Sequence, residues 1–446
     1  MYVHLFKKTL AAALLILLTS GMNAQQVKRL TIDDAVDLGM RYNKQLKISK
    51  TKIGVSDLKY KEELGMLAPA VSINSSITHN STNIPVIGLP AYAFGNPSPS
   101  IISATLHDYY LNSLSISQVV FAGLRGWNTL AMNREQVKAS QYDLAADKLT
   151  IKNNIITAYY NHYKLIESKK VVDENIKVLQ QRLKDIQNQV SVGMALKNDV
   201  LQVKLSISNL EQSAAEVQSG IDVSNYNMDV MLGLPDSIKI EIAESGLLSD
   251  KGEFDINGGL KNALLRRPEI KAADTRLSIS HKTLKIARGY YAPVISGGFN
   301  YYYNNPNQRV FIETHSEFDQ SWDIGVRLSW NITNLFTTQF QTSEAKLNIQ
   351  QAEAQHDQVS DNIKMEVNSN YAAYKLALDK IDLNKESIEQ ARENQRLTKD
   401  QYSNGIKNIT DMLNADNLVT VSEINMLNAR IDAEIAYAKL LKATAN

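Results

Sequence analysis

The chain has no cysteine among its 446 residues. This absence excludes disulfides, cysteine metal sites, a thiol nucleophile and a lipid-modified N-terminal cysteine. A charge excess of one sign is also lacking, because 48 lysine and arginine residues nearly balance 47 aspartate and glutamate residues. A nucleic-acid-binding protein would carry a strong basic excess, so we expect no nucleic-acid partner.

Motifs of enzymes and metalloproteins are lacking as well. No two of the seven histidines lie within ten residues of each other, so no local pair of metal ligands is formed. The sequence contains no phosphate-binding loop, nucleophile elbow or zincin motif. We therefore expect no catalytic residues, no metal and no cofactor. His162, beside three tyrosines on a predicted helix, is assigned to packing.

Long apolar runs are confined to the N-terminus. Lys7 and Lys8 precede an apolar run at residues 10–18, and small and polar residues lead to Ala24. This pattern predicts a signal peptide over residues 1–24. The run is too short to span a bilayer, and a buried first helix is the alternative. No later stretch reaches eighteen apolar residues, so the sequence predicts an exported protein without a transmembrane helix.

Proline and glycine are missing from two long stretches. No proline lies between Pro99 and Pro235 or after Pro306, and single glycines interrupt these stretches, Gly193 in 127–219 and Gly405 in 326–446. Helix interiors disfavour proline by roughly 3 kcal/mol and glycine by roughly 1 kcal/mol. Each stretch therefore predicts two long helices joined at one glycine, over about 124–231 and 335–444.

Apolar spacing supports these helices. Residues 176–190 and 200–221 carry apolar side chains at alternating steps of three and four, the heptad pattern of helices packed along their lengths. A helix over about 124–190 would be roughly 100 Å long at 1.5 Å per residue. Such a rod indicates coiled helices rather than a compact core.

The sequence also repeats itself. The Ala-Pro pair at residues 68–69 recurs at 292–293, and the spacing from Gly193 to Asp199 recurs from Gly405 to Asp411. We interpret the chain as a first repeat at 25–235, a connector at 236–252 and a second repeat at 253–446. Each repeat contains helices, an inserted β-hairpin and a long helical hairpin.

The insertions are predicted as strands at about 70–80, 109–120, 294–303 and 321–331, and Pro69 and Pro293 mark the helix-to-strand junctions. From Trp322 to Trp330, apolar and polar residues alternate strictly, which indicates a strand with one apolar face. The two tryptophans lie roughly 26 Å apart at about 3.3 Å per residue. Transmembrane barrels carry an apolar band about 25 Å tall between aromatic girdles, so we expect this strand to lie in an outer-membrane lipid bilayer.

Four strands cannot close a barrel, and open strand edges are not tolerated in lipid. Several chains must therefore contribute strands, and two chains would give eight while three would give twelve. This arithmetic does not choose between the two. The alternative is a pair of exposed hairpins on a coiled coil, whose apolar face would be an aggregation hazard.

The chain resembles the TolC-type outer-membrane efflux proteins over essentially its whole predicted mature length. The most specific segments are the helix tips at 190–200 and 402–413, and the strand-to-helix segment at 121–123. The resemblance implies a mainly α fold with a transmembrane β part, in which a homotrimer forms a twelve-stranded barrel and an α-helical periplasmic tunnel. It also implies a passive conduit in the outer membrane, with a periplasmic adaptor and an inner-membrane pump as partners. The cargo is not specified.

The resemblance further assigns roles at the periplasmic end of the tunnel. Asp411 matches an aperture aspartate, while Asn414 stands where a second aspartate is common. Tyr402 and Lys407 match residues that link to the neighbouring tip, with Asp199 as their acidic partner, and the tips at Gly193 and Gly405 match the adaptor contact. Independently of the family, Asp199 and Asp411 lie early in helices, where acids stabilise the helix dipole by roughly 0.3–1 kcal/mol.

Two other functions fit parts of the sequence. A periplasmic coiled-coil adaptor or scaffold without a pore would keep the long helices, but such proteins carry one helical hairpin together with glycine-rich β segments. A secreted enzyme on a helical scaffold lacks any supporting motif. Extraction separates the channel from the scaffold. A channel stays in the outer membrane until detergent is added, whereas a scaffold leaves with the soluble fraction.

Overall fold

The computed structural model describes residues 27–81, 87–92, 95, 97–98, 100–102, 107–235, 238–243, 254–307 and 317–445. The predicted signal peptide lies outside these residues, as do residues 236–237 and 244–252 of the predicted connector. The described chain is mainly helical, and the strands are few and short by comparison.

The elements occur in the same order in the two halves of the sequence. In the first half they are α2 (Ile32–Tyr42), α3 (Lys44–Met66), β2 (Ala70–His79), β5 (Asp108–Phe121), α4 (Arg125–Ser191) and α5 (Lys197–Leu232). In the second half they are α6 (Ile256–Arg266), α7 (Pro268–Gly289), β7 (Val294–Asn304), β8 (Asp319–Ser329), α8 (Asn334–Ser403) and α9 (Ile409–Thr444). Helices α4 and α8 have 67 and 70 residues, and α5 and α9 have 36 each.

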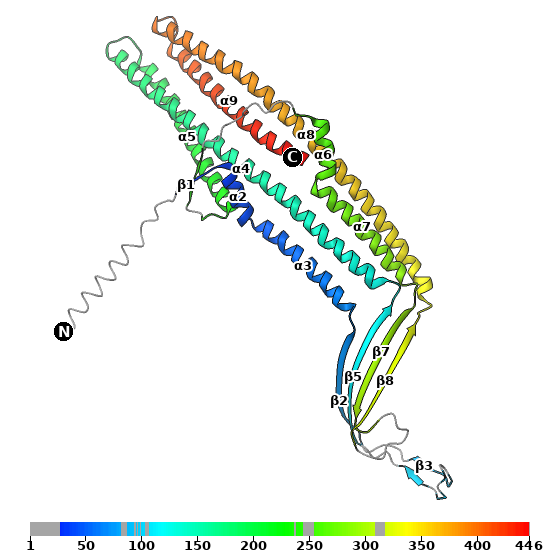
Figure 1. Cartoon of the computed structure of the whole chain (residues 1–446). Helices are drawn as coiled ribbons and strands as arrows, with labels where there is room; N and C mark the ends of the chain where they lie inside the picture. Colours follow the sequence, from blue (N-terminus) through cyan, green and yellow to red (C-terminus); the bar gives the residue numbers. More distant parts are fainter. Residues whose placement is uncertain are drawn as a thin grey trace, which may run out of the picture. The chain divides into compact units, whose positions relative to one another are not determined.

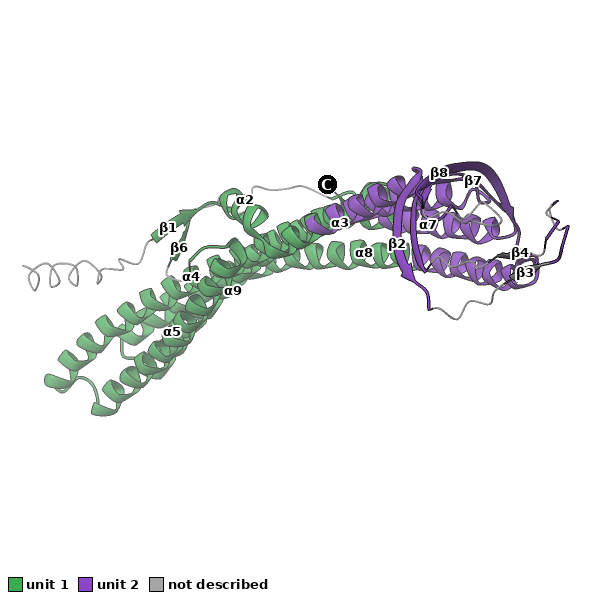
Figure 2. Cartoon of the chain, turned by 90° about the horizontal axis from the view of Figure 1, so that it is seen from below, with its two compact units in different colours: residues 1–50, 142–270, 358–446 green, residues 51–141, 271–357 purple. Residues whose placement is uncertain are grey.

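Two compact units make up the chain, as coloured in Figure 2. Unit 1 comprises residues 1–50, 142–270 and 358–446, and unit 2 comprises residues 51–141 and 271–357. Each unit therefore draws on both halves of the sequence.

Unit 2 contains a four-stranded antiparallel sheet in the order β2-β5-β7-β8, and its strands run side by side in Figure 1. A short hairpin of β3 (Ile87–Leu89) and β4 (Ser100–Ile102) lies within the long β2–β5 connection. Where β5 leads into α4, Gly123 adopts a φ of +65°, and a Cβ there would lie 2.1 Å from the carbonyl oxygen of Gly289. Glycine is thus required both for the backbone conformation and for the close approach of these two segments.

Unit 1 holds two strands that the sequence patterns did not predict. β1 (Val27–Leu30) pairs in parallel with β6 (Lys239–Ile242), which lies inside the predicted connector. The fully buried Tyr159 of α4 packs under these strands, and its hydroxyl donates to the Leu30 carbonyl oxygen at 3.1 Å. This contact satisfies the only polar atom of a large buried side chain.

A second core of unit 1 combines the two helical hairpins. Its buried residues come from α4, α5 and α9. They are Leu179, Ile186, Val203, Ile207, Ile409 and Met412. The heptad seam predicted for α4 and α5 therefore buries its apolar side chains against each other and against the start of α9.

Candidate functional site

The four-stranded sheet has two chemically different faces. Directly paired residues of antiparallel strands project to the same face, so the register defines rows across the sheet. One row contains Ile73, Leu114, Tyr301 and Trp322, and the next row of that face contains Val71, Ile116, Phe299 and Ile324. Between these rows, on the opposite side, lies the row of Ser72, Ser115, Asn300 and Asp323. We call the two sides the apolar face and the polar face.

Among the described residues, no other part of unit 2 covers the apolar face. On β8, Ile324 and Val326 are 74% and 78% exposed. The surfaces of soluble proteins normally carry single, scattered apolar residues. A contiguous exposed apolar face of this kind marks an interaction surface.

Aromatic side chains stand at both ends of this face. The Trp322 ring stacks on Phe299, with 6.4 Å between the ring centroids. At the other end, Trp330 follows β8 by one residue and its Nε1 donates to the Tyr291 carbonyl oxygen at 3.2 Å. Both tryptophans are exposed. Pro69 and Pro293 immediately precede β2 and β7, at the helix end of the sheet.

The two hairpin tips of unit 1 have closely similar geometry. Gly193 and Gly405 turn the chain with φ values of +78° and +74°, a conformation that L side chains rarely adopt. Asp199 and Asp411 then accept from the backbone N–H groups of Leu196 and Asn408, at 2.9 and 3.3 Å. Both aspartates therefore lie in the first turn of a helix, where the dipole argument places acids, and their carboxylates also accept from the N-cap backbone.

Polar contacts join the two tips within one chain. The Tyr402 hydroxyl donates to Gln189 Oε1 at 3.4 Å, and the Thr410 hydroxyl donates to Gln202 Oε1 at 2.9 Å. Burial and the nearby Asp199 carboxylate raise the pKa of Tyr402.

The remaining predicted aperture residues stay within their own hairpin. Lys407 Nζ lies 3.9 Å from Asp411 Oδ1 on the same tip. Asn414 is exposed one turn further along α9. The single chain thus brings Tyr402 near Asp199, while Lys407 reaches Asp411 instead.

The sequence patterns missed a buried ion pair beside the core that joins the two helical hairpins. Arg182 of α4 lies 3.0 Å from Asp416 Oδ2 of α9, and Gln395 of α8 donates to Asp416 Oδ1 at 2.9 Å. Burial raises the pKa of Asp416, and the Arg182 guanidinium opposes that shift. No local sequence motif predicts this pair, because its two members are 234 residues apart in the sequence.

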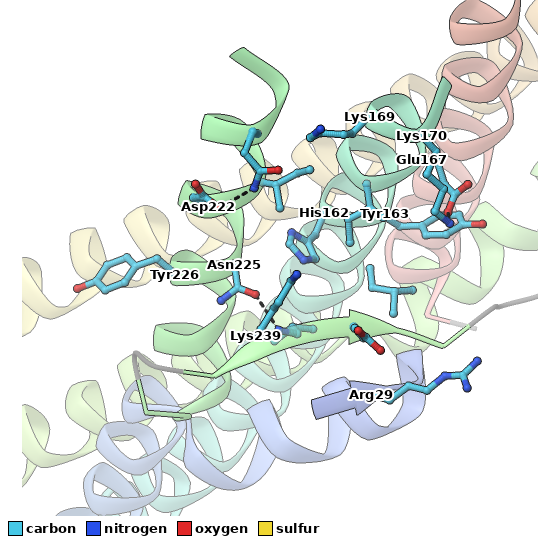
Figure 3. Close-up of a pocket in the computed structure, with 16 residues that line it drawn as sticks. Arg29, His162, Tyr163, Glu167, Lys169, Lys170, Asp222, Asn225, Tyr226 and Lys239 are labelled. Carbon is cyan, nitrogen blue, oxygen red and sulfur yellow. Dashed lines mark hydrogen bonds and ion pairs between the residues drawn. The ribbon is translucent and has the colours of Figure 1, made fainter. Parts of the chain in front are cut away.

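A pocket of about 890 Å³ lies in unit 1 between α4, α5 and the β1–β6 strands (Figure 3). The Asn225 side chain extends the edge of β6, since it donates to the Ile238 carbonyl and accepts from the Ile240 N–H, both at 2.8 Å. His162 lines the pocket and is 1% exposed, and neither ring nitrogen makes a hydrogen bond of normal geometry. Burial lowers the pKa of His162. Charged side chains of both signs line the pocket, so its charge favours no ligand class.

Within the described residues, no group of three or more histidine, aspartate or glutamate side chains is placed to hold a metal ion. No helix in this part of the chain is both long enough and apolar enough to cross a membrane.

The family model described as outer membrane efflux protein matches residues 89–234 and 259–446. The chain belongs to this family. The two matched segments cover well over half of the sequence, one in each predicted repeat. It is therefore an outer-membrane efflux protein, as the resemblance at the helix tips predicts.

Relatives and solved structures agree with this assignment. The outer membrane efflux protein BepC of Brucella suis is 22% identical over 335 residues, which are 74% of this chain and 71% of BepC. The fold is similar to that of CusC, with a TM-score of 0.78, 16% identity, and coverage of 93% of this chain and 91% of CusC. The outer membrane channel CmeC of Campylobacter jejuni gives a TM-score of 0.77 at 17% identity, with coverage of 93% and 85%. Family and neighbours are channel proteins rather than enzymes.

Proposed function

We propose that three copies of this chain form one pore through the outer membrane, with the apolar face in lipid and the polar face around the lumen. The observation that carries this proposal is the two-faced sheet. Its exposed apolar side chains are costly in water and favourable in hydrocarbon, and its serine and asparagine rows suit a water-filled pore.

The sheet edges favour assembly. β2 and β8 are the outer strands of the sheet and pair on one side only. In lipid, unpaired backbone groups cost several kcal/mol each, so β8 of one chain pairs with β2 of the next until the ring closes. Three chains give the twelve strands that the family resemblance implies.

The helical hairpins then continue the pore as a tunnel in the periplasm, and their tips form its aperture. Asp411 provides one ring of negative charge there, while Asn414 leaves a second ring neutral. Tyr402 and Lys407 link to Asp199 of the neighbouring tip, and release of these links widens the aperture. In support, the tips already hold Tyr402 close to Asp199 within one chain.

The proposed pore has no energy source of its own. A periplasmic adaptor contacts the tips at Gly193 and Gly405, and an inner-membrane pump delivers substrates, which cross the tunnel passively. The tips suit such a contact because Val192 and Met194 expose apolar side chains beside the turn.

The absence of cysteine makes cross-linking a direct test of the closed ring. Ser72→Cys on β2 is combined in turn with Ser321→Cys, Gly325→Cys and Ser329→Cys on β8. Within one chain these strands are three spacings of about 4.8 Å apart, well beyond the Cα separation of about 4.4–6.8 Å that a disulfide needs. Any disulfide between them must therefore join two chains.

We expect at least one pair to give dimers and trimers, and no larger species, on denaturing gels after oxidation in the membrane. The control pairs Ser72→Cys with Ser115→Cys, which face each other within one chain and should give monomers only. If every β2–β8 pair stays monomeric while the control oxidises, the shared barrel is wrong and a periplasmic scaffold without a pore becomes the better account.

A further inference from the structure

Charged side chains are nearly absent from the interior of the four-stranded sheet. Asp108 and Asp319 are the first residues of β5 and β8, at the end where the connecting loops lie. Beyond these ends, the four strands contain two charged residues, Asp323 and Arg327, both on β8. Two charges in an otherwise neutral wall will dominate its electrostatic field.

Both charges project from the polar face. Asp323 is paired with Asn300, and Arg327 with Ser296, so the two side chains share a face and lie about 13 Å apart along the strand. The row between them includes Gly298 and Gly325, which have no side chains. No side chain of β7 or β8 therefore lies between the two charges on this face.

The two charges differ in how they are held. Asn300 Nδ2 donates to Asp323 Oδ1 at 2.7 Å, which holds this short side chain against the wall. Arg327 is exposed, and the structure gives its guanidinium no hydrogen-bond or ion-pair partner among the described residues. Its longer side chain is free to extend away from the sheet.

A neighbouring chain would not neutralise this cation. β2, which meets β8 of the next chain in the proposed ring, contains no acidic residue in its sequence Ala-Val-Ser-Ile-Asn-Ser-Ser-Ile-Thr-His. Whatever register the two strands adopt, no carboxylate of β2 faces Arg327. The guanidinium charge thus remains available to the lumen.

We propose that Arg327 is a selectivity residue, whose three copies in the pore favour anionic over cationic substrates at the helix end of the barrel. This inference rests on the proposed function, because the polar face must line a pore. Arg327 reaches toward the pore axis while Asp323 is fixed at the wall, so the guanidinium acts more strongly on a passing ion.

Reversal potentials in planar bilayers test the proposal. Purified protein with the Asp411→Asn substitution is used throughout, so that the proposed acidic ring at the tips does not hide selectivity in the barrel. A KCl gradient from about 0.01 to 0.1 M keeps the Debye length between about 30 and 10 Å. Arg327→Gln removes the charge, and the matched control Arg327→Lys keeps it.

We expect Arg327→Gln to lower the chloride-to-potassium permeability ratio about fivefold, because a unit charge across about 8 Å of water changes the local concentration of each ion about twofold and in opposite directions. Arg327→Lys should match the parent, and Asp323→Asn should raise the ratio by a smaller factor. The differences should vanish near 1 M salt, where the Debye length is about 3 Å.

The two proposals fail in different ways. A conducting protein whose reversal potential is the same with arginine and glutamine at position 327 overturns the selectivity role and leaves the channel intact. A protein that never conducts overturns the channel, and the selectivity role with it.

Discussion

The buried pair of Arg182 and Asp416 offers the sharpest prediction about the helix bundle. The side chains are 16% and 8% exposed, and they join the first helical hairpin to the second. Breaking a buried pair by removing one partner typically costs about 3–5 kcal/mol, whereas replacing both partners by apolar residues is often neutral. An exposed pair contributes only about 0.2–1 kcal/mol.

Arg182→Met leaves the Asp416 carboxylate buried with Gln395 as its remaining partner. We expect the free energy needed to open this part of α9 locally to fall by about 3 kcal/mol, which raises the population of the open state about a hundredfold. Amide hydrogen exchange over residues 409–420, followed by mass spectrometry in detergent at pH 7, measures this change. The control is Lys364→Met, because Lys364 pairs with Asp361 at the surface.

The pH dependence has a definite sign. Burial raises the pKa of Asp416 in the folded state, so an unpaired Asp416 destabilises the fold increasingly as the pH rises through that value. Opening in Arg182→Met should therefore decrease as the pH is lowered from 7 towards the ordinary pKa of an aspartate, after correction for intrinsic exchange. The double variant Arg182→Met, Asp416→Leu should exchange like the parent. Exchange in the single variant within about twofold of the parent would refute the reasoning.

Three further predictions concern the junction, the pocket and the tip. Gly123→Ala should lower the yield of folded protein in a heat-stability assay, since its Cβ would lie 2.1 Å from the Gly289 carbonyl oxygen. Gly297→Ala, with open space around it, should fold normally in the same assay. His162→Leu should flatten the loss of stability below about pH 6.5, because the lowered pKa of buried His162 makes the unfolded state bind more protons there; an unchanged pH profile of thermal unfolding would contradict this. Asp411→Asn should weaken block by trivalent cations added at the tip side, and unaltered block in single-channel records would remove Asp411 from the aperture.

Local patterns in the sequence determine much of this fold. The stretches without proline and glycine correspond to α4 and α5 and to α8 and α9, and the helix expected at about 124–190 lies at Arg125–Ser191. The strict alternation that begins at Trp322 corresponds to β8, although the strand ends at Ser329, so Trp330 lies just beyond it. Periodicity and backbone preferences act within a few residues, and this is why they can be recognised in one sequence.

Contacts between distant residues could not be predicted in the same way. β6 has four residues, too few for a periodic signal, and its partner β1 lies more than 200 residues earlier. Arg182 and Asp416 are ordinary charged residues of long helices until the tertiary structure brings them together. The capping roles of Asp199 and Asp411, by contrast, follow from the local rule for helix starts. Their roles between neighbouring tips remain predictions.

The proposed channel requires that several copies of this chain share one pore. Its most direct test is the conductance of detergent-purified protein in planar bilayers, together with its mass from light scattering. We predict a species of three chains that gives discrete, ion-conducting steps. A water-soluble protein that gives no conductance would contradict the account, because the apolar face of the sheet would then not lie in lipid.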